Sequence, residues 1–152
     1  MDEEGESTIA ASFSKNSREM ICVGVSLWQG KRRLFVRVYA QAPDTKQPVP
    51  TKEGVTLPLE QYRALLDGVR ALAVTGGKEV VTAKIPKNKS QQVWVGANIY
   101  KDIPLLYIRT YAAFTGSKEL KPAKQGVSIR AELYPKLLEA VEKLGKLIEE
   151  KK

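Results

Sequence analysis

The feature that most constrains the fold of this sequence is an internal duplication. The segment VGVSLWQGKRRLFVRVYA (23–40) aligns without a gap with VGANIYKDIPLLYIRTYA (95–112). At the same offset, PTKEGVTLPLEQYRALLDGVRAL (50–72) aligns with PAKQGVSIRAELYPKLLEAVEKL (122–144). Self-similarity over such a length predicts two copies of one structural unit within the chain of 152 residues.

Each repeat is predicted to contain four strands followed by one helix. Runs rich in β-branched and aromatic residues with alternating polarity indicate the strands, and the links Gln29-Gly30 and Lys101-Asp102 are typical of hairpin turns. Apolar residues at helical spacing indicate the two helices. The predicted strands are 8–14, 21–28, 33–42, 54–57, 80–86, 93–100, 104–114 and 126–129, and the predicted helices are 58–74 and 131–151.

The two repeats are expected to form one body of the α+β class. A single ββββα unit has one sheet face to cover and only one helix to cover it, which makes it marginally stable alone. Two units predict a pseudo-twofold, dimer-like body in which each helix helps to bury the apolar surface of the other repeat. We assign 1–7 to an acidic flexible tail, 8–74 to the first repeat, 75–79 to a linker and 80–152 to the second repeat.

Composition argues against several classes of function. The chain has no histidine and a single cysteine, Cys22, which removes the usual ligands of zinc and the usual proton shuttle. No apolar run is long enough to span a membrane, and the acidic start MDEEGES lacks the apolar core of a secretory signal. We therefore expect no enzymatic activity, no metal, no cofactor and no membrane contact. The expected location is the cytoplasm, with the nucleoid, or the nucleus, and not the exterior.

Positive charge dominates the chain and is unevenly placed. The formal net charge is +8 and the isoelectric point is near 9.6. Basic residues gather in the predicted strands and their loops, whereas the predicted helices are close to neutral or slightly acidic. This segregation favours a polyanion bound on the side of the sheets. The alternatives are an ordinary solvated surface and a basic face that binds an acidic protein.

The alternation along the long strand of each repeat predicts which face that polyanion would use. Leu34, Val36 and Val38 form an aliphatic set that should face the core, which leaves Phe35 and Arg37 on the other face. Exposed aromatics beside arginines suit single-stranded nucleic acid, because bases stack on rings and cations neutralise phosphates. The same face is predicted to carry Tyr39, Tyr107, Arg109 and Tyr111, with Trp28 and Tyr100 beside the basic hairpin turns as favoured stacking residues.

Other aromatic residues have a plainer interpretation. Tyr39 and Tyr111 stand at strand ends, where packing under a loop is at least as good an explanation as stacking. Tyr62 and Tyr134 fall on the apolar stripes of the helices and are expected to be structural.

Three short motifs together resemble the transcriptional positive cofactor four family. In the first repeat these are RVY (37–39), PTKEGVTL (50–57) and EQY (60–62), and in the second they are RTY (109–111), KPAKQGVSI (121–129) and ELY (132–134). The resemblance implies a curved four-stranded antiparallel sheet with a helix, in a dimer whose sheets form channels for single-stranded DNA. Here both halves of that dimer would lie in one chain, which makes a monomeric pseudo-dimer the expected state in place of an obligate homodimer.

The resemblance also implies roles for individual residues. The family's stacking phenylalanine falls on Trp28 and Tyr100, and its DNA-contacting arginine falls on Arg37 and Arg109. Alanines stand where the family has a second stacking aromatic, so Phe35, Tyr107 or Phe114 would have to substitute for it. The implied cations are the turn residue Lys31, which the second repeat lacks, and the loop residues Lys52, Lys121 and Lys124.

These observations predict a protein that binds single-stranded DNA with weak sequence selectivity and acts in transcription or DNA maintenance. RNA binding on the same surface remains the alternative, since RNA offers the same phosphates and bases. An enzyme acting on nucleic acid would need paired carboxylates for metal ions, and the basic strands carry almost none.

Overall fold

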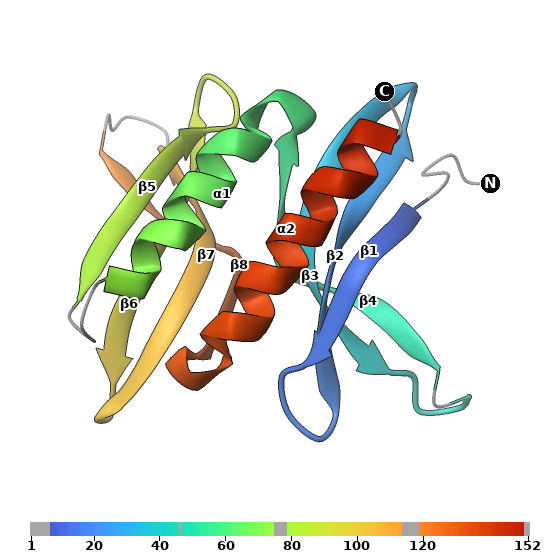
Figure 1. The fold of residues 1–152 in the computed structure, drawn as a ribbon, viewed down its shortest axis with the longest axis horizontal. Coiled ribbons are helices and arrows are strands. Elements are labelled where there is room, and N and C mark those ends of the chain that lie inside the picture. Colours follow the sequence, from blue (N-terminus) through green and yellow to red (C-terminus); the bar gives the residue numbers. More distant parts are fainter. Residues whose placement is uncertain (1–6, 46, 75–78, 114–118, 151–152) are drawn as a thin grey trace.

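Two four-stranded antiparallel sheets and two helices make up the computed structural model (Figure 1). The structure describes residues 7–45, 47–74, 79–113 and 119–150, with only the backbone for Trp28, Val74 and Glu150. The first sheet has β1 (Ser7–Ser14), β2 (Glu19–Trp28), β3 (Lys31–Gln41) and β4 (Pro48–Pro58), and α1 (Tyr62–Ala71) follows it. The second sheet has β5 (Val80–Pro86), β6 (Gln91–Tyr100), β7 (Ile103–Ala113) and β8 (Leu120–Arg130), and α2 (Tyr134–Glu150) follows it.

The predicted order of strands and helices is confirmed, and each sheet follows chain order from edge to edge. Both central hairpins turn as predicted. Gln29 and Gly30 have φ values of 51° and 77°, and Lys101 and Asp102 have φ values of 50° and 67°. Positive φ at both central residues is the requirement of the tight two-residue turn that matches the twist of antiparallel strands.

Each helix packs on the sheet of the other repeat. In Figure 1, α2 lies across β1 and β2, and α1 lies across β5 and β6. One continuous core results, with aliphatic residues from both sheets and both helices, such as Val36, Leu65, Val95 and Leu144. The expectation that each helix buries the apolar face of the other repeat is confirmed, as is the dimer-like body.

Two tyrosines mark the pseudo-twofold relation between the repeats. The Tyr62 hydroxyl donates a hydrogen bond of 2.7 Å to the carbonyl of Val141. The equivalent Tyr134 hydroxyl donates one of 3.0 Å to the carbonyl of Val69. Each bond joins one helix to the other, and both rings pack against the core. These tyrosines are structural, as their place on the apolar stripes predicted.

The last strand of each sheet begins earlier than predicted. The strand expected at 54–57 begins at Pro48, and the one expected at 126–129 begins at Leu120. The polar Lys/Pro-rich composition of the segments before Gly54 and Gly126 predicts loops there. Because β4 and β8 are edge strands, a proline that lacks an N–H donor on the unpaired edge costs the sheet little stability.

The helix limits differ only at their ends. A short 3₁₀ turn precedes each helix, at Leu59–Gln61 and at Ala131–Leu133. The predicted division into a tail, two repeats and a linker remains a prediction, because residues 1–6 and 75–78 lie outside the described part of the chain.

Candidate nucleic-acid interface

The face of each sheet that points away from the helices is here called its outer face. Leu34, Val36 and Val38 of β3 are all 0% exposed and face the helices. By strand alternation, Arg37 and Tyr39 therefore lie on the outer face, where both are half-buried. The predicted division of β3 into a core side and an outer side is confirmed.

A groove of about 590 Å³ runs over the outer face of the first sheet. We call it the first groove. It contains three cations and two aromatic rings, and no acidic residue is among the described residues that line it. The lining residues are Ser7, Ser26, Arg33, Phe35, Arg37, Tyr39, Pro50, Thr56, Lys87 and Asn88.

The second sheet carries a groove of about 690 Å³ at the equivalent place, here called the second groove. Seven of its lining residues stand at positions equivalent to those of the first groove: Glu79, Asn98, Tyr107, Arg109, Tyr111, Pro122 and Ser128. The two repeats thus form equivalent grooves although their sequences differ, which indicates that the groove is a property of the fold.

The predicted arginines occupy these grooves with most of their donors free. Arg37 donates one hydrogen bond of 2.9 Å from Nη1 to the carbonyl of Thr51, and Arg109 donates one of 3.3 Å to the carbonyl of Ala123. Neither has an acidic partner within the described residues. A guanidinium has five N–H donors, so each arginine keeps donors for an incoming anion.

A glycine on the neighbouring strand lets each arginine backbone approach closely. Gly54 lies opposite Arg37 in the pairing of β3 with β4. A Cβ atom at Gly54 would lie 2.8 Å from the Cα atom of Arg37, which no real side chain tolerates. Just beyond this pair the register shifts between Arg37 and Tyr39, as it does between Arg109 and Tyr111. The repeated glycine in the family-like motif therefore shapes the floor of the groove.

Phe35 does not offer the open stacking face that was expected of it. Only 3% of the residue is exposed. Its ring packs over Gly24, its cross-strand neighbour on β2, because the missing side chain there leaves room for it. Tyr107 lies over Gly96 in the same way but remains half-buried. Burial raises the pKa of the Tyr107 phenol, so the ring stays neutral.

The second repeat contains an aromatic stack that the sequence analysis did not assign to the site. The Trp94 and Tyr111 rings are parallel within 8°, with centroids 3.8 Å apart, and Lys84 Nζ lies 4.3 Å from the centroid of a Trp94 ring. Trp94 lies directly opposite Arg109 in the pairing of β6 with β7 and so shares its face. The signal was present in the alternation of Trp94 with Gly96 and Asn98 along β6.

The remaining predicted residues that the structure describes are absent from the linings of both grooves. Tyr100 is 59% exposed at the end of β6, with Lys101 Nζ 5.3 Å from its ring centroid. The Trp28 side chain and Phe114 lie outside the described part of the structure. The other four are exposed lysines on β3, β4 and β8: Lys31, Lys52, Lys121 and Lys124.

The lone cysteine lies on the outer side of β2, opposite Arg37 in the pairing of β2 with β3. Cys22 is 2% exposed, and burial raises the pKa of its thiol. No cluster of metal-ligating side chains occurs among the described residues. Over the same residues, no helix has the length and apolar character required to cross a membrane.

Parts of this chain are similar to a family model and to a solved structure. Residues 15–68 match the family model described as Transcriptional Coactivator p15 (PC4). The solved structure of a PC4 homolog from Burkholderia pseudomallei is 20% identical, and the match covers 43% of this chain and 94% of that one, with a TM-score of 0.39. No curated protein sequence matches the chain. The resemblance found in the sequence is thereby confirmed: the chain is PC4-like, with the family match in its first repeat and a second copy of the same sheet-and-helix unit after it.

Proposed function

We propose that this protein binds single-stranded DNA with weak sequence selectivity and serves in transcription or DNA maintenance. The observation that carries the proposal is the pair of equivalent grooves on the outer faces, each with an arginine between aromatic rings. The PC4-like character of the chain supports it, because that family is described as a transcriptional coactivator.

Phosphate contacts would supply most of the affinity. The unpaired donors of Arg37 and Arg109 lie at the outer faces, and the exposed Lys31, Lys52, Lys121 and Lys124 add further cations on β3, β4 and β8. Such contacts position a strand but do not identify its bases. Weak sequence selectivity follows from this chemistry.

Aromatic rings would favour a single strand over a duplex. The exposed Tyr100, the half-buried Tyr107 and the stacked pair Trp94 and Tyr111 present rings on the outer side of the second sheet. A base stacks on a ring only when it is not enclosed in a duplex, and each such stack contributes about 1–3 kcal/mol. We include Trp28 in this set on the resemblance of its sequence position.

Binding, and not catalysis, is the proposed activity, and a monomeric pseudo-dimer is the proposed state. One chain already contains both halves of the dimer-like body, since each helix covers the sheet of the other repeat. A second chain is therefore not needed to bury either sheet.

Fluorescence anisotropy tests the proposal directly. The full chain is titrated into a labelled single-stranded DNA, a duplex of the same sequence and length, and the matching RNA. We expect clearly tighter binding to the single strand than to the duplex. Tighter binding to RNA than to DNA would favour the alternative, RNA-binding function, and equal affinity for strand and duplex would reject stacking as a determinant.

A further inference from the structure

The two grooves have equivalent positions but different charges. Arg33, Arg37 and Lys87 line the first groove, and no acidic residue accompanies them in the part of the lining that the structure describes. The second groove has Arg109 as its one lining cation among the described residues, together with the carboxylate of Glu79. Leu105 stands at the position equivalent to Arg33, and Ser7 at the position equivalent to Glu79.

Lys87 reaches the first groove from the second repeat. It lies in the turn between β5 and β6, and this turn sits beside the start of α1, where Gln61 Nε2 donates a hydrogen bond of 3.0 Å to the carbonyl of Pro86. The side chain is half-buried next to Arg33 and Arg37. Burial and these two positive charges lower the pKa of the Lys87 ammonium. Its ammonium has no hydrogen-bonding or ion-pair partner among the described residues.

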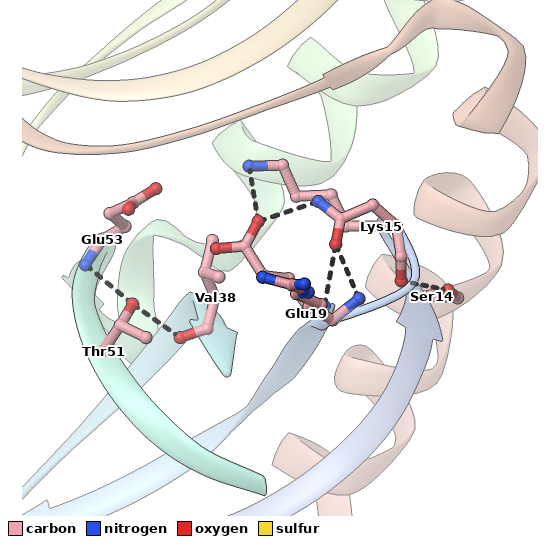
Figure 2. A network of polar contacts seen from close by, with 8 residues as sticks. Ser14, Lys15, Glu19, Val38, Thr51 and Glu53 are labelled. Carbon is pink, nitrogen blue, oxygen red and sulfur yellow. Dashed lines mark hydrogen bonds and ion pairs between the residues drawn. The ribbon is translucent and has the colours of Figure 1, made fainter. Parts of the chain in front are cut away.

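The equivalent lysine of the first repeat has its charge compensated. Lys15 Nζ lies 3.7 Å from Oε1 of Glu19, and Figure 2 shows this pair. At the position equivalent to Glu19 the second repeat has Gln91, which carries no charge and accepts a hydrogen bond of 2.8 Å from Asn88. One substitution between the repeats thus leaves Lys87 uncompensated while Lys15 is paired.

The carboxylate of the second groove is fixed in place. The backbone N–H of Ile99 donates a hydrogen bond of 3.3 Å to Oε2 of Glu79. A phosphate that enters this groove meets Arg109 and a negative charge together, so the two effects oppose each other.

We propose that the first groove is the principal phosphate-binding site for a single strand, that Lys87 of the second repeat completes it, and that the second groove binds phosphate weakly. This inference rests on the proposed function. Three cations with no acidic neighbour among the described lining residues repel each other, and a phosphate both relieves that repulsion and accepts their hydrogen bonds. The fused repeats therefore bind a strand unequally, although their folds match.

The decisive comparison uses a matched pair of variants, Lys87→Gln and Lys15→Gln. Each is titrated into labelled oligothymidylate, in the full chain, near 0.1 M salt. Loss of one phosphate contact to a single strand at this salt lowers affinity by roughly fivefold and reduces the salt slope by about 0.7. We expect that loss for Lys87→Gln and a change below about twofold for Lys15→Gln, whose charge is already paired.

A second pair of variants moves the acidic group between the grooves. Ser7→Glu introduces a carboxylate into the first groove, at the position equivalent to Glu79. Glu79→Gln removes the carboxylate from the second groove. Because Ser7 and Glu79 are exposed, neither change should disturb folding, which a melting curve verifies. We expect Ser7→Glu to weaken binding several-fold and Glu79→Gln to bind the strand at least as tightly as the parent chain.

If Lys87→Gln and Lys15→Gln lose affinity for oligothymidylate equally, or if neither loses affinity, the proposed difference between the grooves is wrong. The proposed function would not be affected by that result. Failure of the parent chain to bind oligothymidylate would reject the proposed function itself, and the inference with it.

Discussion

Arg37 and Arg109 combine a structural contact with free donors. Each holds the carbonyl of the neighbouring edge strand with one guanidinium nitrogen and directs its remaining donors toward a groove. A hydrogen bond from a charged group of this kind contributes about 1.5–3 kcal/mol to the free energy of unfolding. A folded domain has about 5–15 kcal/mol in total, so the loss of one such bond should leave the chain folded.

We predict that Arg37→Ala and Arg109→Ala each weaken binding to a single strand while the chain stays folded. Each change removes one potential phosphate contact to a single strand, so the salt slope should fall by about 0.7. Binding is measured by anisotropy and folding by thermal melting. Arg63→Ala is the control, because Arg63 is exposed on α1 and pairs with Asp67 at 3.2 Å. A variant that melts much earlier but binds normally would show that its arginine is structural.

The aromatic contribution is best tested at Tyr100, the most exposed of the large apolar and aromatic side chains described. If a base stacks there, Tyr100→Ala should cost about 1–3 kcal/mol of binding free energy. The salt slope should stay the same, because no charge is removed. Ile99→Ala is the control. Ile99, the residue before Tyr100, is 47% exposed and points to the other side of β6. Equal small effects for both variants would place the stacking surface elsewhere.

At the scale of elements, the helices are joined by reciprocal hydrogen bonds from Tyr62 and Tyr134. We predict that Tyr62→Phe and Tyr134→Phe each lower the free energy of unfolding by about 1 kcal/mol, because each removes one half-buried hydrogen bond. Binding should not change, as both tyrosines lie on the helix side of the sheets. Chemical denaturation measures the loss, and Tyr100→Phe, at an exposed ring, serves as the reference. If Tyr62→Phe and Tyr134→Phe have the same free energy of unfolding as Tyr100→Phe, the two hydrogen bonds are not formed in solution.

Strand alternation predicted the faces of β3 and β7 because a strand with one face in the core has only one acceptable register. The start of β4 at Pro48 could not be predicted in the same way, since its edge position is known only once the sheet is assembled. The burial of Phe35 depends on Gly24 of another strand, and the pairing of those two residues follows from the hairpin. The burial of Phe35 is therefore predictable from the sequence once that hairpin is placed.

The position of Lys87 in the first groove could not be predicted from the sequence. Its turn belongs to the second repeat, and it reaches the first sheet only through the way the two repeats dock. No local pattern of residues encodes that docking.

For the whole molecule, the two repeats differ where they meet at their pseudo-twofold axis. Arg70 Nη2 lies 3.4 Å from Oε2 of Glu142, and these residues occupy the same position in the two repeats. In a dimer of identical units this position would face its own copy, with like charges together. The exposed pair adds little stability, but it illustrates the same asymmetry that distinguishes the two grooves.

The central claim is that the outer faces of this one chain bind a single strand through phosphates and stacked bases. The most direct measurement extends the comparison of single strand and duplex across a series of salt concentrations. We predict tighter binding to the single strand throughout, with log K falling against log salt at a slope of roughly −3 to −6, as on the order of 4–8 phosphates are neutralised. Equal affinity for the duplex, or a slope near zero, would contradict the account.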